Sequence, residues 1–501
     1  LSQDWFYATE LRFLHVQLIY VPLMLLFDDW LMVRYIGALI MQAMYIASFG
    51  CLVHAAGKNS RFFFRGAALL LLPVSVTYGR VVLYHNHYLI NMAVAFLVLS
   101  LSMKFLGTVD WKSKKTWIFL ALLAILSFVA GLNSLRQLMI THAPLLIIAV
   151  VLWWIEDAQN DAPNQTAILK PTNYHFLLCT VYSAFFSFLG LIAQDFLCRK
   201  LGLHIAVQSE NNYLTFEGIH SIPEILYGYF HQFGYRKDRI PLLSVSGILS
   251  LGGIFTGCYL VGISIKQLLQ QKFRQDRRSV VLSLFFLAHT AVLILICLIT
   301  KGAISYYYPL YLSLCFPWAV PLLLIHFEEL PSTLHPLHVK KFFALVAVII
   351  LLLSSAINHL YFHGSDRFPQ VYEGLFFQEK DHKAELTEVV DFLMEEGYDK
   401  GYATYWDCNI ITEMTNGKMT MVLIYDLDEL SSGNLSCRNW LCSLWPQEAP
   451  CEKPFLLLSE QSAEIFQLSD SYIYCTPIYS GHNFIAYSID HPAEFADTCR
   501  Y

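Results

Sequence analysis

Two histidines, an asparagine and an arginine stand between two apolar runs in the stretch "YGRVVLYHNHYLINM". They are Arg80, His85, Asn86 and His87. Polar side chains in such a position usually face a cavity, so we expect them to bind part of a polar substrate. The alternative is that they are ordinary residues at the level of lipid headgroups. Two histidines are too few ligands for a zinc site, so no metal ligand is assigned, although a divalent metal stays open as a cofactor.

Two further stretches combine a basic residue with polar or aromatic neighbours. Arg136 lies in "SLRQLMITHAP", and Lys301, Tyr306 and Tyr307 lie in "TKGAISYYYPLY". A guanidinium can bind a phosphate through two parallel hydrogen bonds, and an ammonium can bind it as a point charge. Tyrosine rings stack on sugars, but they also anchor proteins at membrane interfaces. We therefore expect these residues to bind a phosphate and a sugar; the alternative for the two basic residues is simple extension toward the headgroups.

Two carboxylates near the start of the chain are candidates for a general base. Asp4 and Glu10 lie in "LSQDWFYATELR". A carboxylate within hydrogen-bond reach of a hydroxyl can accept its proton during catalysis. Both can equally be solvated surface residues, and Glu10 can pair with Arg12.

The composition is that of a polytopic membrane protein. Of the 501 residues, 56% are hydrophobic and 14% are charged, whereas soluble domains have about 25% charged residues. The net charge of -6 argues against nucleic acid as a partner. The chain begins at Leu1, and we expect one more membrane span upstream of it.

Ten windows are apolar and long enough to cross a bilayer, which takes about 20 residues in a helix. They are 34–54, 62–80, 88–106, 116–132, 137–155, 175–195, 241–264, 279–300, 305–326 and 341–360. The segment 11–27 is apolar too, but polar residues and Pro22 interrupt it. We expect that segment to be a helix at the membrane interface.

The loops between these windows alternate in charge. One set of loops contains fifteen lysines and arginines and the other set contains eight. Basic loops are typically cytoplasmic, so the first set is predicted to face the cytoplasm. The first set is 55–65, 104–115, 156–174, 265–278 and 327–341, and the second is 80–87, 133–136, 196–240 and 301–304. All the candidate residues above, and everything after residue 360, are then extracytoplasmic.

The last part of the chain has a different pattern. "HKAELTEVVDFLMEEGYD" has helical spacing, "NIITEMTNG" is expected to be a short helix, and five stretches are expected to be strands. The strands are "GYATYW", "MTMVLIY", "PFLLLS", "SYIYCTPIYS" and "NFIAYSI". The pattern predicts a membrane domain over 1–360 and a small α/β domain over 361–501. Six of the twelve cysteines lie in this second part, and disulfides and free thiols are both open.

Three stretches resemble the GT-C membrane glycosyltransferases, in particular the bacterial relatives of protein O-mannosyltransferases and of lipid A aminoarabinose transferase. "DDWLMVRYIGALIMQAMYIASFGCLVHAAGK" is similar to the region of the second span, "KGAISYYYPLYLSL" to the start of a late span, and "GYATYWDCNIITEMTNGKMTMVLI" to a C-terminal extracytoplasmic domain. The resemblance implies a multi-pass protein of a bacterial cell membrane. It also implies transfer of a sugar from a polyprenyl phosphate to a glycan, lipid or protein of the cell envelope.

The implied reaction assigns roles to the residues above. An acidic residue in the first extracytoplasmic loop is the family's key residue, and Asp4 is the candidate for it here. The departing phosphate needs positive charge, which Arg80, Arg136 or Lys301 could supply. A single displacement would invert the sugar's anomeric configuration. The alternative function is a flippase for lipid-linked saccharides, which would need polar groups through the middle of the membrane; the predicted spans largely lack them.

Overall fold

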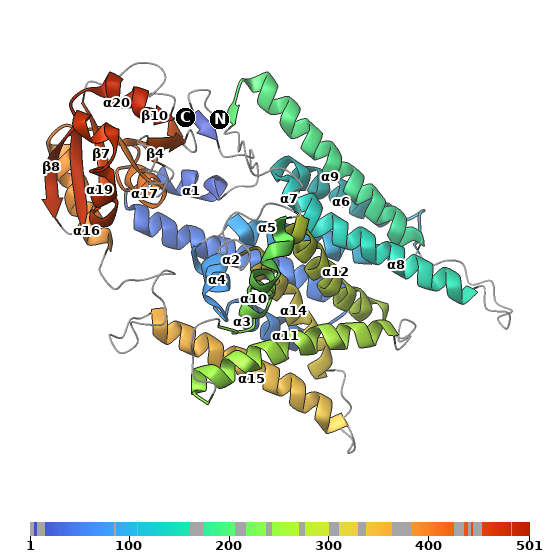
Figure 1. Cartoon of the computed structure of the whole chain (residues 1–501). Helices are drawn as coiled ribbons and strands as arrows, with labels where there is room; N and C mark the ends of the chain where they lie inside the picture. Colours follow the sequence, from blue (N-terminus) through green and yellow to red (C-terminus); the bar gives the residue numbers. More distant parts are fainter. Residues whose placement is uncertain are drawn as a thin grey trace.

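The computed structural model describes the greater part of the chain. The described residues are 5–7, 16–84, 87–107, 109–160, 174–205, 217–236, 243–269, 276–299, 310–328, 337–362, 382–424, 435–438, 442–443, 453–481 and 483–500. The first 362 residues are mainly helical, and the C-terminal part is a sheet covered by helices (Figure 1).

The helical part is built from long apolar helices joined by short ones. Among the described residues, eight helices are long and apolar enough to cross a membrane: Trp30–Ala55, Tyr88–Phe105, Lys114–Asn133, Leu135–Ile155, Tyr174–Leu201, Gly247–Gln267, Arg277–Ile299 and Leu310–Phe327. The prediction of a multi-span membrane protein is confirmed at this level. The elements are α1 (Gln17–Met24), α2 (Trp30–Ala55), α3 (Ser60–Leu70), α4 (Val76–Gly79), η1 (Arg80–Tyr84), α5 (His87–Ser102), η2 (Met103–Phe105), α6 (Lys114–Asn133), α7 (Leu135–Gln137), η3 (Leu138–His142), α8 (Ala143–Asn160), α9 (Tyr174–Leu201), η4 (Glu217–Ser221), α10 (Ile222–His231), α11 (Val245–Leu269), α12 (Arg277–Ile299), η6 (Ser313–Cys315), α14 (Phe316–Glu328) and α15 (Leu337–Phe362).

One predicted span is not a continuous helix. The window 62–80 is divided into α3, a break, α4 and the π-helical η1. The break contains Pro73, and a proline disfavours helical geometry in the residue before it. The hydroxyl of Tyr78 donates to the carbonyl of Leu70 across the break at 2.6 Å. This hydrogen bond joins the two short helices that replace the predicted span.

The broken segment nevertheless carries the chain back along α2 as far as the level of Gln42, in the middle of that helix. The Gln42 side chain donates to the carbonyl of Val82 at 3.0 Å, and Ser100 donates to the carbonyl of Cys51 at 3.0 Å. Residue numbers therefore rise in the same direction along α2 and α5. Since these two helices run parallel, the chain must cross back between them, as the predicted alternation of loops requires.

The predicted interfacial segment contains a helix shorter than expected. Helix α1 covers Gln17–Met24 and includes Pro22. Leu18, Val21 and Leu25 on it or next to it are exposed. Such an apolar exposed helix fits a place at the membrane interface, which stays a prediction.

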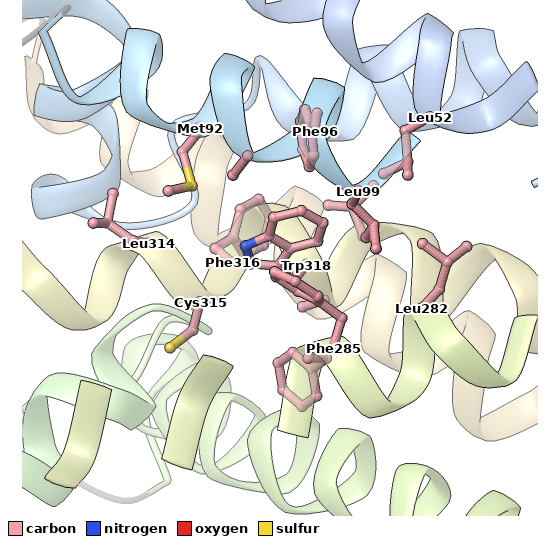
Figure 2. Close-up of a cluster of buried hydrophobic side chains, with 14 of the residues drawn as sticks. Leu52, Met92, Phe96, Leu99, Leu282, Phe285, Leu314, Cys315, Phe316 and Trp318 are labelled. Atoms are coloured by element: carbon pink, nitrogen blue, oxygen red, sulfur yellow. The ribbon is translucent and has the colours of Figure 1, made fainter. Parts of the chain in front are cut away.

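The centre of the helical part is an aromatic cluster around Trp318 on α14. Its ring centroid lies 4.8 Å from that of Phe96 on α5 and 4.1 Å from that of Phe285 on α12 (Figure 2). All three rings are fully buried. Aromatic pairs at these distances add to the effect of burial alone, so the cluster fixes α5, α12 and α14 against one another.

Helices α6 and α9 are in backbone contact. A Cβ atom on Gly131 would lie 1.8 Å from the carbonyl oxygen of Ser187, and one on Gly190 would lie 2.0 Å from that of Phe128. The hydroxyls of Ser127 and Ser183 are 2.8 Å apart in the same interface. Small residues allow such close approach between membrane helices.

The C-terminal part contains a seven-stranded sheet of order β10-β5-β4-β3-β7-β9-β8. Strands β4, β3 and β7 are parallel, and β9 is antiparallel to β7. One apolar cluster packs α16 and α17 on one face, and a second packs α19 and α20 on the other. The elements are α16 (His382–Glu395), β3 (Lys400–Thr404), α17 (Tyr405–Met414), β4 (Thr420–Ile424), β5 (Leu435–Arg438), β7 (Pro454–Ser459), α19 (Glu460–Phe466), η9 (Asp470–Tyr474), β8 (Cys475–Gly481), β9 (Phe484–Ile489), α20 (Pro492–Thr498) and β10 (Cys499–Arg500).

Most predicted elements of this part are confirmed, with two differences. The stretch "SYIYCTPIYS" is a strand only in its second half, because Asp470–Tyr474 form a 3-10 helix. Helix α17 begins at Tyr405, earlier than predicted, and the chain turns at Gly417, whose φ is +76°. Cys408 and Cys475 are free thiols, and the side chains of the other four cysteines of this part lie outside the described residues.

A second, three-stranded sheet joins distant parts of the chain. Strand β1 (Trp5–Tyr7) lies between β2 (His204–Ile205) and β6 (Cys442–Ser443). It is parallel to β2, which follows α9, and antiparallel to β6, which belongs to the C-terminal part. The N-terminal segment is thereby tied to both halves of the protein.

We expect Gly131→Ala to destabilise the protein by about 1–3 kcal/mol, the usual cost of overpacking, because the new methyl group would collide with the backbone of α9. The matched control is Gly262→Ala on α11, where a Cβ would meet nothing within 4 Å. Thermal unfolding in detergent would measure both. A midpoint in Gly131→Ala equal to that of the control would show that α6 and α9 do not pack this closely.

Candidate functional site

Three of the stretches singled out in the sequence meet at one end of the helical part. Asn91 lies one turn into α5, just after the "YHNHY" stretch, and Gln137 ends α7 in the "SLRQLMITHAP" stretch. The Gln137 side chain donates to Asn91 Oδ1 at 2.9 Å. The third stretch arrives through Tyr311, whose ring lies beneath the guanidinium of Arg136.

A buried amide network holds the first two stretches together. Asn91 Oδ1 also accepts a hydrogen bond from Asn133 Nδ2 at 3.3 Å, and the Asn91 carbonyl accepts a second one from Gln137 at 3.3 Å. The Thr141 hydroxyl donates to Gln137 Oε1 at 3.0 Å. Gln137 and Thr141 are fully buried. Since a buried polar group without partners is costly, these reciprocal contacts fix α7 and η3 on α5.

Arg136 is held at the edge of this network. Its backbone N–H donates to the hydroxyl of Ser134 at 2.9 Å. Its guanidinium carbon lies 5.6 Å from the centroid of the Tyr311 ring. A cation over an aromatic face is favourable, and a planar guanidinium can bind an oxyanion through two parallel hydrogen bonds. The side chain is half-buried, as a group at a site entrance should be.

Arg80 lies deeper and is 6% exposed. It follows α4 directly, and α4 contacts η6, two residues after Tyr311. Tyr78 of α4 packs on Phe316 with ring centroids 4.6 Å apart. Within the described residues of the helical part, Arg80 is the buried side chain with a permanent charge. An arginine in such a place is by default part of a binding site or a pathway.

Both arginines adjoin a π-helical segment. Arg80 is the first residue of η1, and Arg136 lies two residues before η3. π-helical turns are rare, and they occur frequently at functional sites. The regular helical structure is therefore interrupted at η1 and η3, next to the two candidate arginines.

Two buried histidines connect η3 to neighbouring helices. His142 Nδ1 lies 3.1 Å from the hydroxyl of Ser183, and His289 Nδ1 lies 2.8 Å from the carbonyl oxygen of Ile140. Both imidazoles are fully buried. They connect the π-helical turn to α9 and α12, so the site rests on the core of the helical part.

The long loop between α9 and α11 contributes a fourth segment. The hydroxyl of Ser75 donates to Gln232 Oε1 at 3.2 Å, and Gln232 Nε2 lies 3.4 Å from the Thr77 hydroxyl. Gln232 directly follows α10 and is fully buried. These contacts brace α4, and therefore the backbone that leads into Arg80.

The two arginines were predicted from the sequence as site residues, whereas the side-chain amides were not. Asn91, Asn133 and Gln137 lie within or beside the stretches that were quoted, and the signal that could have found them is an amide inside an apolar run. His289 lies in the middle of α12 and was also missed.

Most of the other candidates lie outside the described residues. These are Asp4, Glu10, His85, Lys301, Tyr306 and Tyr307. His87 begins α5, but its side chain is outside the description. Their roles stay predictions. In the described part of the chain, no group of three or more histidines, cysteines, aspartates or glutamates could hold a metal ion.

The sequence matches no family model and no curated protein sequence. Among solved structures, the fold is similar to the crystal structure of the apo form of the Archaeoglobus fulgidus oligosaccharyltransferase. The sequence identity is 11% and the TM-score is 0.42. The match covers 92% of this chain and 63% of the archaeal chain, so it spans less than two thirds of that protein.

The amide network makes a prediction that does not depend on any activity. Gln137→Leu leaves the Asn91 amide without its main partner, and we expect it to destabilise the protein by about 1–3 kcal/mol. The double variant Asn91→Leu/Gln137→Leu should lose less than the sum of the single variants, because both partners become apolar.

Thermal unfolding of the two single variants and the double variant gives the coupling between them. As a control, Gln137→Leu combined with Ser264→Ala should be additive, because the Ser264 hydroxyl donates to Leu260 of its own helix, α11. Additive losses for Asn91 and Gln137 would contradict the network.

Proposed function

We propose that this protein transfers a sugar from a polyprenyl-phosphate donor to a glycan, lipid or protein acceptor at the extracytoplasmic face of a bacterial cell membrane. The observation that carries the proposal is that Arg136 lies over Tyr311, and that α4, which leads directly into Arg80, contacts η6 in the same segment. Two cationic groups at one end of a membrane-length helical bundle suit a phosphate whose lipid chain lies in the bilayer.

The chemistry of the leaving group explains why arginines are needed. When the bond between the anomeric carbon and the phosphate oxygen breaks, the oxygen keeps the electron pair and negative charge develops on the phosphate. Preorganised cations stabilise that charge most where water is excluded. Arg80 is buried and Arg136 is half-buried, so both lie where an ionic contact with a phosphate is strong.

The remaining roles fall on the predicted residues. In the proposed reaction the acceptor hydroxyl attacks the anomeric carbon, and a carboxylate, Asp4 or Glu10, takes its proton. Lys301 would add positive charge at the phosphate. His85, His87, Tyr306 and Tyr307 would bind the sugar.

A flippase for lipid-linked saccharides is the second candidate, and the helix interiors argue against it. Several buried hydroxyls in the described spans donate to the backbone of their own helix. Thr256 donates to Gly252, Ser264 to Leu260 and Ser283 to Ser279, each at 2.9–3.0 Å. Hydroxyls used in this way do not offer polar groups to a passing saccharide. This distribution favours a transferase.

Replacing either arginine tests the proposal. Arg136→Gln and Arg80→Gln should each lower kcat by about 10²–10³, the usual loss on removing one preorganised donor. Arg136→Lys should keep part of the rate because the charge remains. Arg199→Gln is the matched control, since this exposed arginine pairs with Asp195 one turn away. Transfer at the wild-type rate by both Gln variants, measured with a radiolabelled polyprenyl-phosphate sugar, would remove the arginines from the mechanism.

The orientation can be tested with single added cysteines in intact cells. Leu468 is 84% exposed in the C-terminal part, and Lys112 is exposed in a loop predicted to be cytoplasmic. We expect an impermeant maleimide to label Leu468→Cys before lysis and Lys112→Cys only after lysis, with the wild-type protein giving the background. The reverse pattern would overturn the proposed topology.

A further inference from the structure

Helix α2 carries a partly buried amide in the middle of its membrane-length run. Gln42 lies halfway along the 26 residues of α2, and the residues on either side of it are apolar. A side-chain amide in such a place is costly unless it has a hydrogen-bond partner. The Gln42 amide donates to the carbonyl of Val82 at 3.0 Å. Its partner is therefore the π-helical turn η1, to which Val82 belongs.

The next turn of α2 contacts the same segment through a tyrosine. The hydroxyls of Tyr45 and Tyr78 lie 3.4 Å apart, and Tyr78 donates its single hydroxyl proton to the carbonyl of Leu70 at 2.6 Å. Tyr45 is therefore the donor to Tyr78. Both side chains are fully buried. Because Gln42 and Tyr45 are three residues apart in a helix, they lie on one face of α2.

These two contacts lie on either side of Arg80 in the sequence. Tyr78 precedes Arg80 by two residues, and Val82 follows it by two. Helix α4 ends at Gly79 and η1 begins at Arg80, so the helical geometry changes at this residue. A side chain that bonds to the backbone at such a point can fix the bend of the chain. The direction in which the Arg80 side chain leaves the backbone is thus set between two contacts from α2.

Helix α2 is itself held by the aromatic cluster around Trp318. The ring of Tyr45 is stacked on that of Phe96, with centroids 5.6 Å apart, and Phe49 packs on the same ring at 5.6 Å. Phe96 in turn packs on Trp318 (Figure 2). The face of α2 that contacts α4 and η1 is therefore fixed relative to α5 and α14.

We propose that Gln42 and Tyr45 are positioning residues for Arg80: together they form a clamp on α4 and η1 that directs the Arg80 guanidinium toward the donor phosphate. The inference rests on the proposed sugar transfer, in which Arg80 stabilises the charge on the departing phosphate. Neither Gln42 nor Tyr45 is assigned a contact with the substrate. Gln42 has the larger role, because Val82 lies within the π-helical turn itself.

Hydrogen exchange tests the clamp without any need for activity. Gln42→Met keeps a side chain of similar length and removes the donor. In this full-length variant, amides of α4 and η1 should exchange faster than in the wild-type protein, while those of α12 should not change. Ser100→Ala is the matched control, because the Ser100 hydroxyl donates to the carbonyl of Cys51 near the end of α2, also at 3.0 Å. Unchanged exchange at η1 in Gln42→Met would overturn the clamp.

A double-mutant cycle tests the positioning role. We expect Gln42→Met to lower kcat by up to about a hundredfold, as a small misplacement of a reacting group can, with a smaller change in the KM for the polyprenyl-phosphate sugar. In an Arg80→Gln background the same substitution should lower kcat little further, because the group that it displaces is already absent. In an Arg136→Gln background it should lower kcat by its full factor. An equal loss in both backgrounds would overturn the positioning role.

Tyr45→Phe is the second variant, and it keeps the stacked ring while it removes the donor to Tyr78. We expect the same pattern in the cycle with a smaller loss of kcat, because Tyr78 keeps its own hydrogen bond to Leu70. If Gln42→Met does not fold, Tyr45→Phe decides the matter alone. Equal losses of kcat for Tyr45→Phe in the Arg80→Gln and Arg136→Gln backgrounds would then contradict the clamp.

The two proposals can fail separately. Sugar transfer that depends on Arg80 but is unchanged in Gln42→Met and Tyr45→Phe would overturn the positioning role and leave the transferase in place. A wild-type protein that transfers no sugar would overturn the proposed function and, with it, the positioning role. Faster exchange at η1 in Gln42→Met would in that case still establish α2 as the anchor of the turn.

Discussion

The candidate site depends on one buried contact, the pairing of the Gln137 and Asn91 carboxamides. This contact joins α5 to the short helix that carries Arg136, and the buried Asn133 side chain adds a further hydrogen bond to Asn91 Oδ1. In an interior of low dielectric an amide pair is strong when satisfied and costly when broken. The pair therefore fixes the positions of the π-helical turn η3 and of Arg136, which stacks on Tyr311.

The aromatic cluster around Trp318 holds the helix that carries Asn91. Phe96 is on the same helix as Asn91, and it packs against Trp318, which in turn packs against Phe285. His289 lies one turn after Phe285 and reaches the carbonyl of Ile140 inside η3. Packing and polar contacts thus act on the same three helices. Ser75 and Gln232 likewise hold α4, and therefore the backbone that leads into Arg80.

The sequence allowed much of this architecture to be predicted, for identifiable physical reasons. Apolar runs of membrane length are visible without any tertiary information, and the short apolar strands of the sheet are nearly as clear. The prediction of one continuous span over 62–80 was wrong, because the hydrophobicity of the whole window does not reveal the break at Pro73. Arg80 and Arg136 stood out as charges between apolar runs. The pairing of Asn91 with Gln137 could not be predicted, since it depends on which helices become neighbours.

Two kinds of contact hold the described parts of the chain together. The bundle end rests on buried amides and rings, whereas the contact between the helical and C-terminal parts depends on the partly exposed ion pair of Arg34 with Glu413 and a few backbone bonds. Exposed ion pairs stabilise little, so this second contact is the weaker of the two. The arginines of the candidate site belong to the bundle, so their positions are fixed by its core. In the proposed transferase, the donor phosphate would then meet cations that are already in place.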